Sequence, residues 1–174
     1  MKINIILILI ILFIYLIKKR PKYNINNNIL PFGYQYTEKI NTGTKKDFYN
    51  YCVNLQNKTN TQIAYSGVAA AMYAEVVSNV SDKLQFFNSG KSIIEKSIAR
   101  DSYNPELRFL RFSVQEKAPR MLGYSSNLEE DADLIYYALT NGFANKNDNF
   151  WSTVIKFIVA SGVSENTKSK FKKL

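Results

Sequence analysis

Two arginines and a glutamine have a spacing that could hold an anion. Arg108 and Arg111 lie three residues apart, and Gln115 follows one turn later. On a helix such residues share one face, and guanidinium groups bind carboxylates or phosphates through paired hydrogen bonds. The same side chains could instead be structural, with apolar stems that cover the core and heads that pair with acidic groups. We favour the structural interpretation and keep ligand binding as the alternative.

The densest acidic cluster of the chain follows these arginines. It lies at the start of an expected helix, where the helix dipole favours negative charge, and consists of Glu129, Glu130, Asp131 and Asp133. Clustered carboxylates could also bind Mg²⁺ or Ca²⁺, or divide the roles of general acid and base. Their spacing does not match a calcium-binding loop. We therefore expect a helix start that lies in water or pairs with arginine, and no metal site.

Composition excludes several kinds of chemistry. The chain contains no histidine, which rules out Ser-His-Asp and Cys-His catalysis and the usual zinc sites. Cys52 is the single cysteine, so it has no partner for an intrachain disulfide, and we expect it to be a small core residue. No motif in the sequence indicates a cofactor, and we expect none. The sequence therefore favours a protein that is not an enzyme.

The net charge of +9 is concentrated at the two ends of the chain. The first group of cations surrounds an apolar run and includes Lys18, Lys19 and Arg20. The second group closes the chain with Lys168, Lys170, Lys172 and Lys173. Because binding to phosphates needs clustered cations and the middle of the chain is close to neutral, we expect no nucleic-acid partner. Both basic groups are expected to contact a membrane surface instead.

The apolar run at residues 3–17 contains no charged residue. It covers about 22 Å as a helix, against about 30 Å for a bilayer core, and the flanking Lys2 and Lys18 can extend it. A cleaved signal peptide is less well matched, because no small residues follow as a cleavage site. The sequence predicts a single-pass membrane anchor at residues 1–20. The cations after the run predict a cytoplasmic domain, with an exported domain as the alternative.

Three further segments follow the predicted anchor. Residues 21–43 contain prolines, glycines and an asparagine run without apolar periodicity, and are interpreted as a tether. Within the tether, Leu30, Phe32 and Tyr34 could dock on the domain that follows. A helical domain is predicted at residues 44–162. Residues 163–174 are predicted to be a basic tail, too short for a stable helix of its own and expected to fray unless it binds a membrane or a partner.

The residues that could carry chemistry are expected to lie on helices. No alternating pattern of strand length is present, so the predicted fold class is all-α, a small domain of antiparallel helix pairs behind one transmembrane helix. Apolar spacing and stop signals predict helices at residues 45–57, 61–80, 82–100, 105–118, 128–140 and 149–160. The helix at 61–80 is apolar nearly all round, which is typical of a central helix.

Polar residues mark where these helices should begin. Thr44 and Ser126 are each followed three residues later by an acidic residue, which is the spacing of a capping box. Asn104 precedes a proline suited to the first helical position. The expected N-caps are Thr44, Ser81 or Asp82, Asn104 and Ser126.

The helix at 82–100 carries a glycine next to its apolar face. The core residues expected on that face are Leu84, Phe87, Ile94 and Ile98. Glycine inside a helix costs about 1 kcal/mol relative to alanine. Gly90 therefore predicts a close approach of another helix, and the small residues around Gly67 on the preceding helix would allow it.

This pair of helices, with the corner at residues 101–104, is similar to a tetratricopeptide-type hairpin. Gly67, Gly90 and Ile94 match its interlocking positions, whereas Ser102 stands where proline is usual and no second repeat follows. The segments AYSGVAAAMYAE, FFNSGKSIIEKSI, NPELRFLRFSVQEKAPRMLGY and NLEEDADLI together resemble a group of short, uncharacterised bacterial helical proteins, over residues 63–139. That resemblance implies a helical fold and no activity.

Two functions are compatible with this sequence. The first is a membrane-anchored helical module that binds a protein partner whose identity the sequence does not show. The second is a small ligand-binding or enzymatic domain that uses Arg108 and Arg111 against the acidic cluster at 129–133. The two differ in one structural feature. In the first, these charged side chains contact one another, whereas in the second they line an open pocket with unpaired heads.

Overall fold

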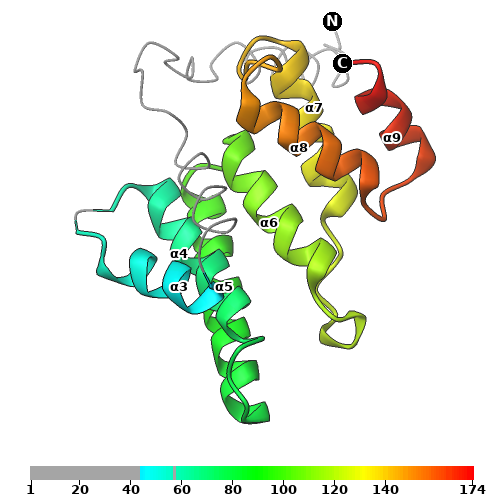
Figure 1. Cartoon of the computed structure of the whole chain (residues 1–174). Helices are drawn as coiled ribbons and strands as arrows, with labels where there is room; N and C mark the ends of the chain where they lie inside the picture. Colours follow the sequence, from blue (N-terminus) through cyan, green and yellow to red (C-terminus); the bar gives the residue numbers. More distant parts are fainter. Residues whose placement is uncertain (1–43, 57) are drawn as a thin grey trace, which may run out of the picture.

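The computed structural model describes residues 44–56 and 58–174, which fold into helices (Figure 1). No strand occurs within these ranges, so the predicted all-α class is confirmed. A short 3-10 helix, η1 (Arg120–Leu122), follows the fourth described α-helix. The α-helices are α3 (Lys45–Asn54), α4 (Asn60–Tyr73), α5 (Val80–Arg100), α6 (Pro105–Lys117), α7 (Leu128–Thr140), α8 (Asn149–Ala160) and α9 (Glu165–Lys172).

The finer part of the predicted fold class, a transmembrane helix followed by tetratricopeptide-like pairs, is wrong. Among the described helices, none combines the length and the apolar character needed to cross a membrane. α4 and α5 pack against each other as expected, whereas α6, the helix after them, lies between two cores. The segments 1–20 and 21–43, with Lys18, Lys19 and Arg20, lie outside the described residues, and the location of the domain stays a prediction.

Side-chain caps determine where most helices begin. Thr44 and Asp47 form the predicted capping box at α3. The Asn104 side chain accepts hydrogen bonds from the first turn of α6, as predicted, and Pro105 takes the first helical position. α5 differs from the prediction, because its cap is Asn79, whose side chain accepts from the Ser81 backbone at 2.8 Å. The preceding helix ends at Tyr73 and not near residue 80, which leaves a connection of six residues.

α4 and α5 form an antiparallel pair whose backbones meet at two glycines. A Cβ atom on Gly90 would lie 2.4 Å from the Gly67 carbonyl oxygen and 2.8 Å from the Ala71 backbone nitrogen. One further contact lies seven residues along each helix, where the Asn60 side chain donates to the Ser97 carbonyl at 3.0 Å. The predicted close crossing at Gly90 is therefore confirmed.

α6 is the central helix of the domain and divides its hydrophobic interior in two. Leu107 and Leu110 lie in a first core with α3, α4 and α5, where Cys52 is buried as predicted. Phe109 and Phe112 lie in a second core with α7, α8 and α9. A third face of the same helix is polar and carries Arg108, Arg111 and Gln115. The sequence assigned the central position to the helix at 61–80 instead, because that helix is apolar nearly all round.

The C-terminal residues are part of the folded domain. α9 packs beside α7 and α8 (Figure 1), and its Phe171 is almost fully buried in the second core. Ser164 caps the helix through the Thr167 backbone. Residues 163–174 therefore form a packed helix and not a frayed tail. Its ordering comes from apolar residues that pack in the second core, where Val163 and Phe171 are buried and Leu174 lies against them.

The apolar face of α5 continues past the end of the domain. Phe87, Ile94 and Ile98 are buried along this face. Val80 and Leu84 extend the same face toward the helix start and are 71% and 44% exposed, so the prediction of Leu84 as a core residue is wrong. Figure 1 shows that this end of α5 projects beyond the neighbouring helices. Tyr124 packs edge-on against Phe87 in the buried half of the face. Among the described residues, none buries Val80 or Leu84.

Candidate functional site

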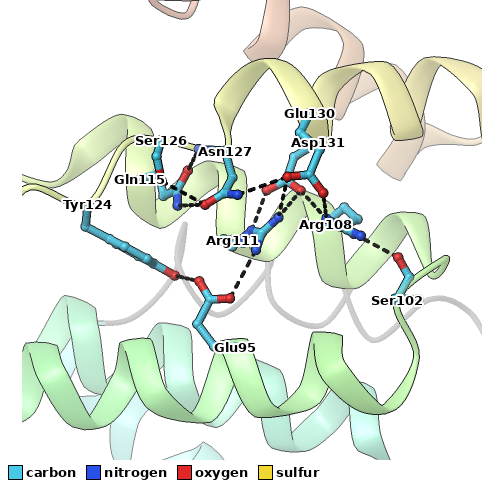
Figure 2. Close-up of polar contacts among 10 residues, drawn as sticks. All are labelled: Glu95, Ser102, Arg108, Arg111, Gln115, Tyr124, Ser126, Asn127, Glu130 and Asp131. Carbon is cyan, nitrogen blue, oxygen red and sulfur yellow. Dashed lines mark hydrogen bonds and ion pairs between the residues drawn. The ribbon is translucent and has the colours of Figure 1, made fainter.

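Two arginines of α6 converge on one carboxylate of α7 (Figure 2). Arg111 donates from Nε to Asp131 Oδ2 at 2.8 Å and from Nη2 to Oδ1 at 2.7 Å, which is a bidentate pair. Arg108 donates from Nη1 to the same Oδ1 at 3.0 Å. Asp131 is fully buried, and both arginines are more than nine-tenths buried. Because both of its oxygens accept hydrogen bonds from guanidinium groups, Asp131 has the geometry of an ionised carboxylate.

The network extends from this pair to α5 and to the loop before α7. Arg111 Nη1 donates to Glu95 Oε2 at 3.0 Å, and the Tyr124 hydroxyl donates to the other oxygen of Glu95 at 2.7 Å (Figure 2). Arg111 therefore joins two carboxylates that come from different helices. The result is a continuous polar connection from α5 through α6 to α7.

The second arginine secures the corner between α5 and α6. Arg108 Nε donates to the backbone carbonyl of Ser102 at 2.8 Å, and its Nη1 donates to Glu130 Oε1 at 2.7 Å. Gln115 closes the other end of the network. Its amide donates to Asn127 Oδ1 and accepts from the Asn127 backbone, each at 3.2 Å. Every predicted anion-binding side chain of α6 thus holds a neighbouring element in place.

Burial and charge act against each other within this network. Burial raises the pKa of Asp131, whereas the hydrogen bonds and charges of the two arginines lower it, with a net increase. For Arg111, burial lowers the pKa, but Asp131 and Glu95 outweigh it and the net shift is upward. Burial and the bond to Glu95 raise the pKa of Tyr124 far above its usual value. Arg111 and Tyr124 therefore hold their protons at neutral pH and serve as hydrogen-bond donors.

The other predicted site residues lie apart from the arginines. Glu129 accepts hydrogen bonds from the Ser164 backbone at 2.6 Å and the Thr167 hydroxyl at 2.7 Å, so it ties α7 to the start of α9. It does not act in the predicted capping box, since the N-cap of α7 is Asn127. The acidic cluster is therefore divided between two structural roles, one facing α6 and one facing α9.

The predicted basic tail carries a second set of ion pairs. Lys170 contacts Asp133 at 2.9 Å, and Lys168 contacts Glu165 at 2.8 Å on the same helix. Lys172 and Lys173 are exposed. In the described part of the chain, no three histidine, cysteine, aspartate or glutamate side chains are grouped so that they could hold a metal ion.

Sequence reasoning missed several members of the network. Asp131 was recognised within the acidic cluster but not singled out as its centre, and Glu95 and Tyr124 were not considered. One signal was available for Asp131, because it lies one turn before Ile135 on the face that becomes buried. No comparable signal existed for Glu95, whose role depends on how α5 crosses α6.

Acid should loosen the contact between α7 and α9. The bonds from Thr167 and Ser164 lower the pKa of Glu129 below its ordinary value of 4.5. A carboxylate with a lowered pKa stabilises the fold above the unfolded value, and this contribution is lost as the pH falls through the folded value. Glu129→Gln should therefore reduce the fall in melting temperature between about pH 5 and pH 2. If the melting temperatures of the two proteins fell equally with pH across this range, the assigned role would be contradicted.

Comparison of the chain with models of protein families finds no match, and neither curated proteins nor solved structures show significant similarity to it.

Proposed function

We propose that this domain is a helical module that binds an apolar segment of a protein partner. The observation that carries the proposal is the exposure of three apolar side chains that are close in sequence, Val76, Val80 and Leu84, called here the α5 stripe. Val80 and Leu84 lie one helical turn apart on one face, and Val76 lies in the connection that leads into the helix. Buried apolar surface contributes about 25 cal/mol per Å² to association, so a partner that covers the stripe would gain free energy.

The shape of the stripe indicates how a partner would bind. The stripe is the continuation of a face that already packs against protein in its buried half, at Phe87 and Ile94. An apolar segment laid on it would lengthen an existing core instead of starting a new one. This resembles the general mode in which apolar anchors of one element enter the exposed groove or face of a helical domain. The fold alone does not establish this use, and the exposed stripe is what supports it.

The competing function, ligand binding or catalysis at the arginines, is not supported by the arrangement of the charged groups. A site for a substrate carboxylate or phosphate needs guanidinium donors that face an open space. The donors of Arg108 and Arg111 are directed instead at Asp131, Glu130, Glu95 and the Ser102 carbonyl. We therefore infer that the network holds the helices together so that the module can present its surface.

Removing the stripe should abolish binding without unfolding the domain. The variant Val80→Ser with Leu84→Ser changes two exposed side chains, so its melting temperature should stay close to that of the wild type. Affinity for a partner that covers both should fall at least about tenfold, since each buried aliphatic side chain contributes about 1.5–3 kcal/mol. The matched control is Asp82→Asn, an exposed position of the same turn on the opposite side of the helix.

The measurement has two steps. Proteins that co-purify with the full chain are compared among the wild type, the double serine variant and the Asp82→Asn control. Any protein retained by the wild type and the control but lost from the double variant is then purified, and its affinity is measured directly. Equal affinity for the wild type and the double variant would contradict the assignment of the stripe as the binding surface.

A further inference from the structure

The first described residues of the chain lie near Val76, the member of the α5 stripe that comes first in the sequence. α3 begins at Lys45, whose ammonium group forms an ion pair with Glu75. Glu75 immediately precedes Val76, which is 47% exposed and forms the near end of the stripe. The described part of the chain therefore begins near Val76, at the end of the stripe that comes first in the sequence. Any segment just before residue 44 is tethered close to the stripe.

The sequence just before this entry point contains a short apolar segment. Residues 30–36 read LPFGYQY, in which Leu30, Phe32, Tyr34 and Tyr36 alternate with other residues. In an extended backbone, alternate side chains lie on the same side, so the four side chains can form one face. The segment carries no charged residue, and therefore no charge has to be taken out of water when it is covered.

The tether is long enough for the segment to reach the surface. Eleven residues lie between Phe32 and Thr44, which allows a reach of up to about 40 Å. The helical part of the stripe, from Val80 to Leu84, is about 6 Å long. A segment tethered at this distance has an effective concentration on the order of millimolar, so weak contacts suffice for it to bind. The run at residues 3–17 is separated from the stripe by a longer tether, which lowers its effective concentration there.

We propose that residues 30–36 lie on the α5 stripe and that a protein partner has to displace them. This inference rests on the proposed function, because it names what covers the binding surface before a partner arrives. The tethered segment acts as a competitor within the same chain. A partner therefore binds only when its own contacts with Val80 and Leu84 exceed those of the segment.

The test uses a photo-reactive residue in the full chain. Benzoylphenylalanine replaces Leu84, and in a matched control it replaces Asp82, which is exposed on the opposite side of the same turn. Intact expressing cells are irradiated, and the products are separated by mass and mapped by peptide sequencing. We expect a product of monomer mass from position 84, with the cross-link in the peptide that contains residues 30–36. The same product should be lost in Phe32→Ser combined with Leu30→Ser.

The remaining outcomes separate this inference from the proposed function. Cross-links from position 84 that appear only at twice the chain mass, or only to another protein, overturn the inference and leave the α5 stripe as a binding surface. Cross-links from position 84 that are no more abundant than those from position 82 overturn the inference, and the co-purification result then decides the proposed function by itself. A monomer-mass product unchanged by the two serine substitutions also overturns it.

Discussion

Arg111→Met should destabilise the domain by about 3–5 kcal/mol, the typical cost of removing one partner from a buried ion pair. The substitution leaves Asp131 fully buried with Arg108 as its remaining cationic partner, and it also removes the donor to Glu95. Methionine fills most of the space of the arginine stem, so lost packing contributes little. The measurement is the free energy of unfolding from denaturant titration at neutral pH.

The matched control is an ion pair at the surface. Lys170→Met breaks the contact with Asp133, in which both side chains are more than one-third exposed. Exposed pairs of this kind contribute little, so the denaturation midpoint should stay close to that of the wild type. If Arg111→Met shifted the midpoint no more than Lys170→Met does, the buried network would have no special role in stability.

Gly90→Ala should also destabilise the domain, by about 1–3 kcal/mol, through overpacking at the helix crossing. The direction is informative because helix propensity alone predicts the opposite, a gain of about 1 kcal/mol for alanine. The new methyl group would meet the backbone of α4, at the Gly67 carbonyl and the Ala71 nitrogen. Backbone atoms on a packed helix cannot move aside as the end of a side chain can, so α4 and α5 would have to separate.

A second glycine provides the control for this substitution. A Cβ atom on Gly162 would lie 3.5 Å from Glu116 Oε2, an ordinary contact with the end of a flexible side chain. Gly162→Ala should therefore leave the melting temperature nearly unchanged. A Gly90→Ala protein that melts at or above the temperature of the wild type would mean that α4 and α5 do not cross as closely as described.

Local signals predicted much of the fold. The bounds of α7 and α8 match the structure, and α6 differs from its prediction by one residue. These helices are bounded by signals that act within a few residues, such as the Asn104 cap with Pro105 and the stop at Pro119. The crossing at Gly90 could be predicted for a similar reason, because glycine within a helix is costly unless its missing side chain is needed.

Features that depend on tertiary contacts could not be predicted in this way. The early end of α4 and the cap at Asn79 were missed because Val76 and Val77 continue an apolar pattern that resembles helix. α9 was taken for a tail because only the packing of Phe171 against other helices distinguishes it from one. The exposure of Leu84 has the same origin, since it depends on where the covering elements end.

In the candidate site, too, local signals predicted some features, whereas others depend on tertiary contacts. Spacing placed Arg108, Arg111 and Gln115 on one face of a helix, and the structure finds them there (Figure 2). What spacing could not supply was the identity of their partners. Of four neighbouring acidic residues, only Glu130 and Asp131 face the arginines, because the rotation of α7 is set by Ala132 and Ile135 in the second core.

The central claim, that Arg111 and Asp131 act as a structural pair, is tested most directly by a double-mutant cycle. Free energies of unfolding are measured for the wild type, Arg111→Met, Asp131→Asn and the protein with both changes. A pair that holds the helices together should show a coupling energy of at least about 1.5 kcal/mol, because the double variant loses much less stability than the two single losses combined. Additive losses, with a coupling energy below about 0.5 kcal/mol, would contradict the claim.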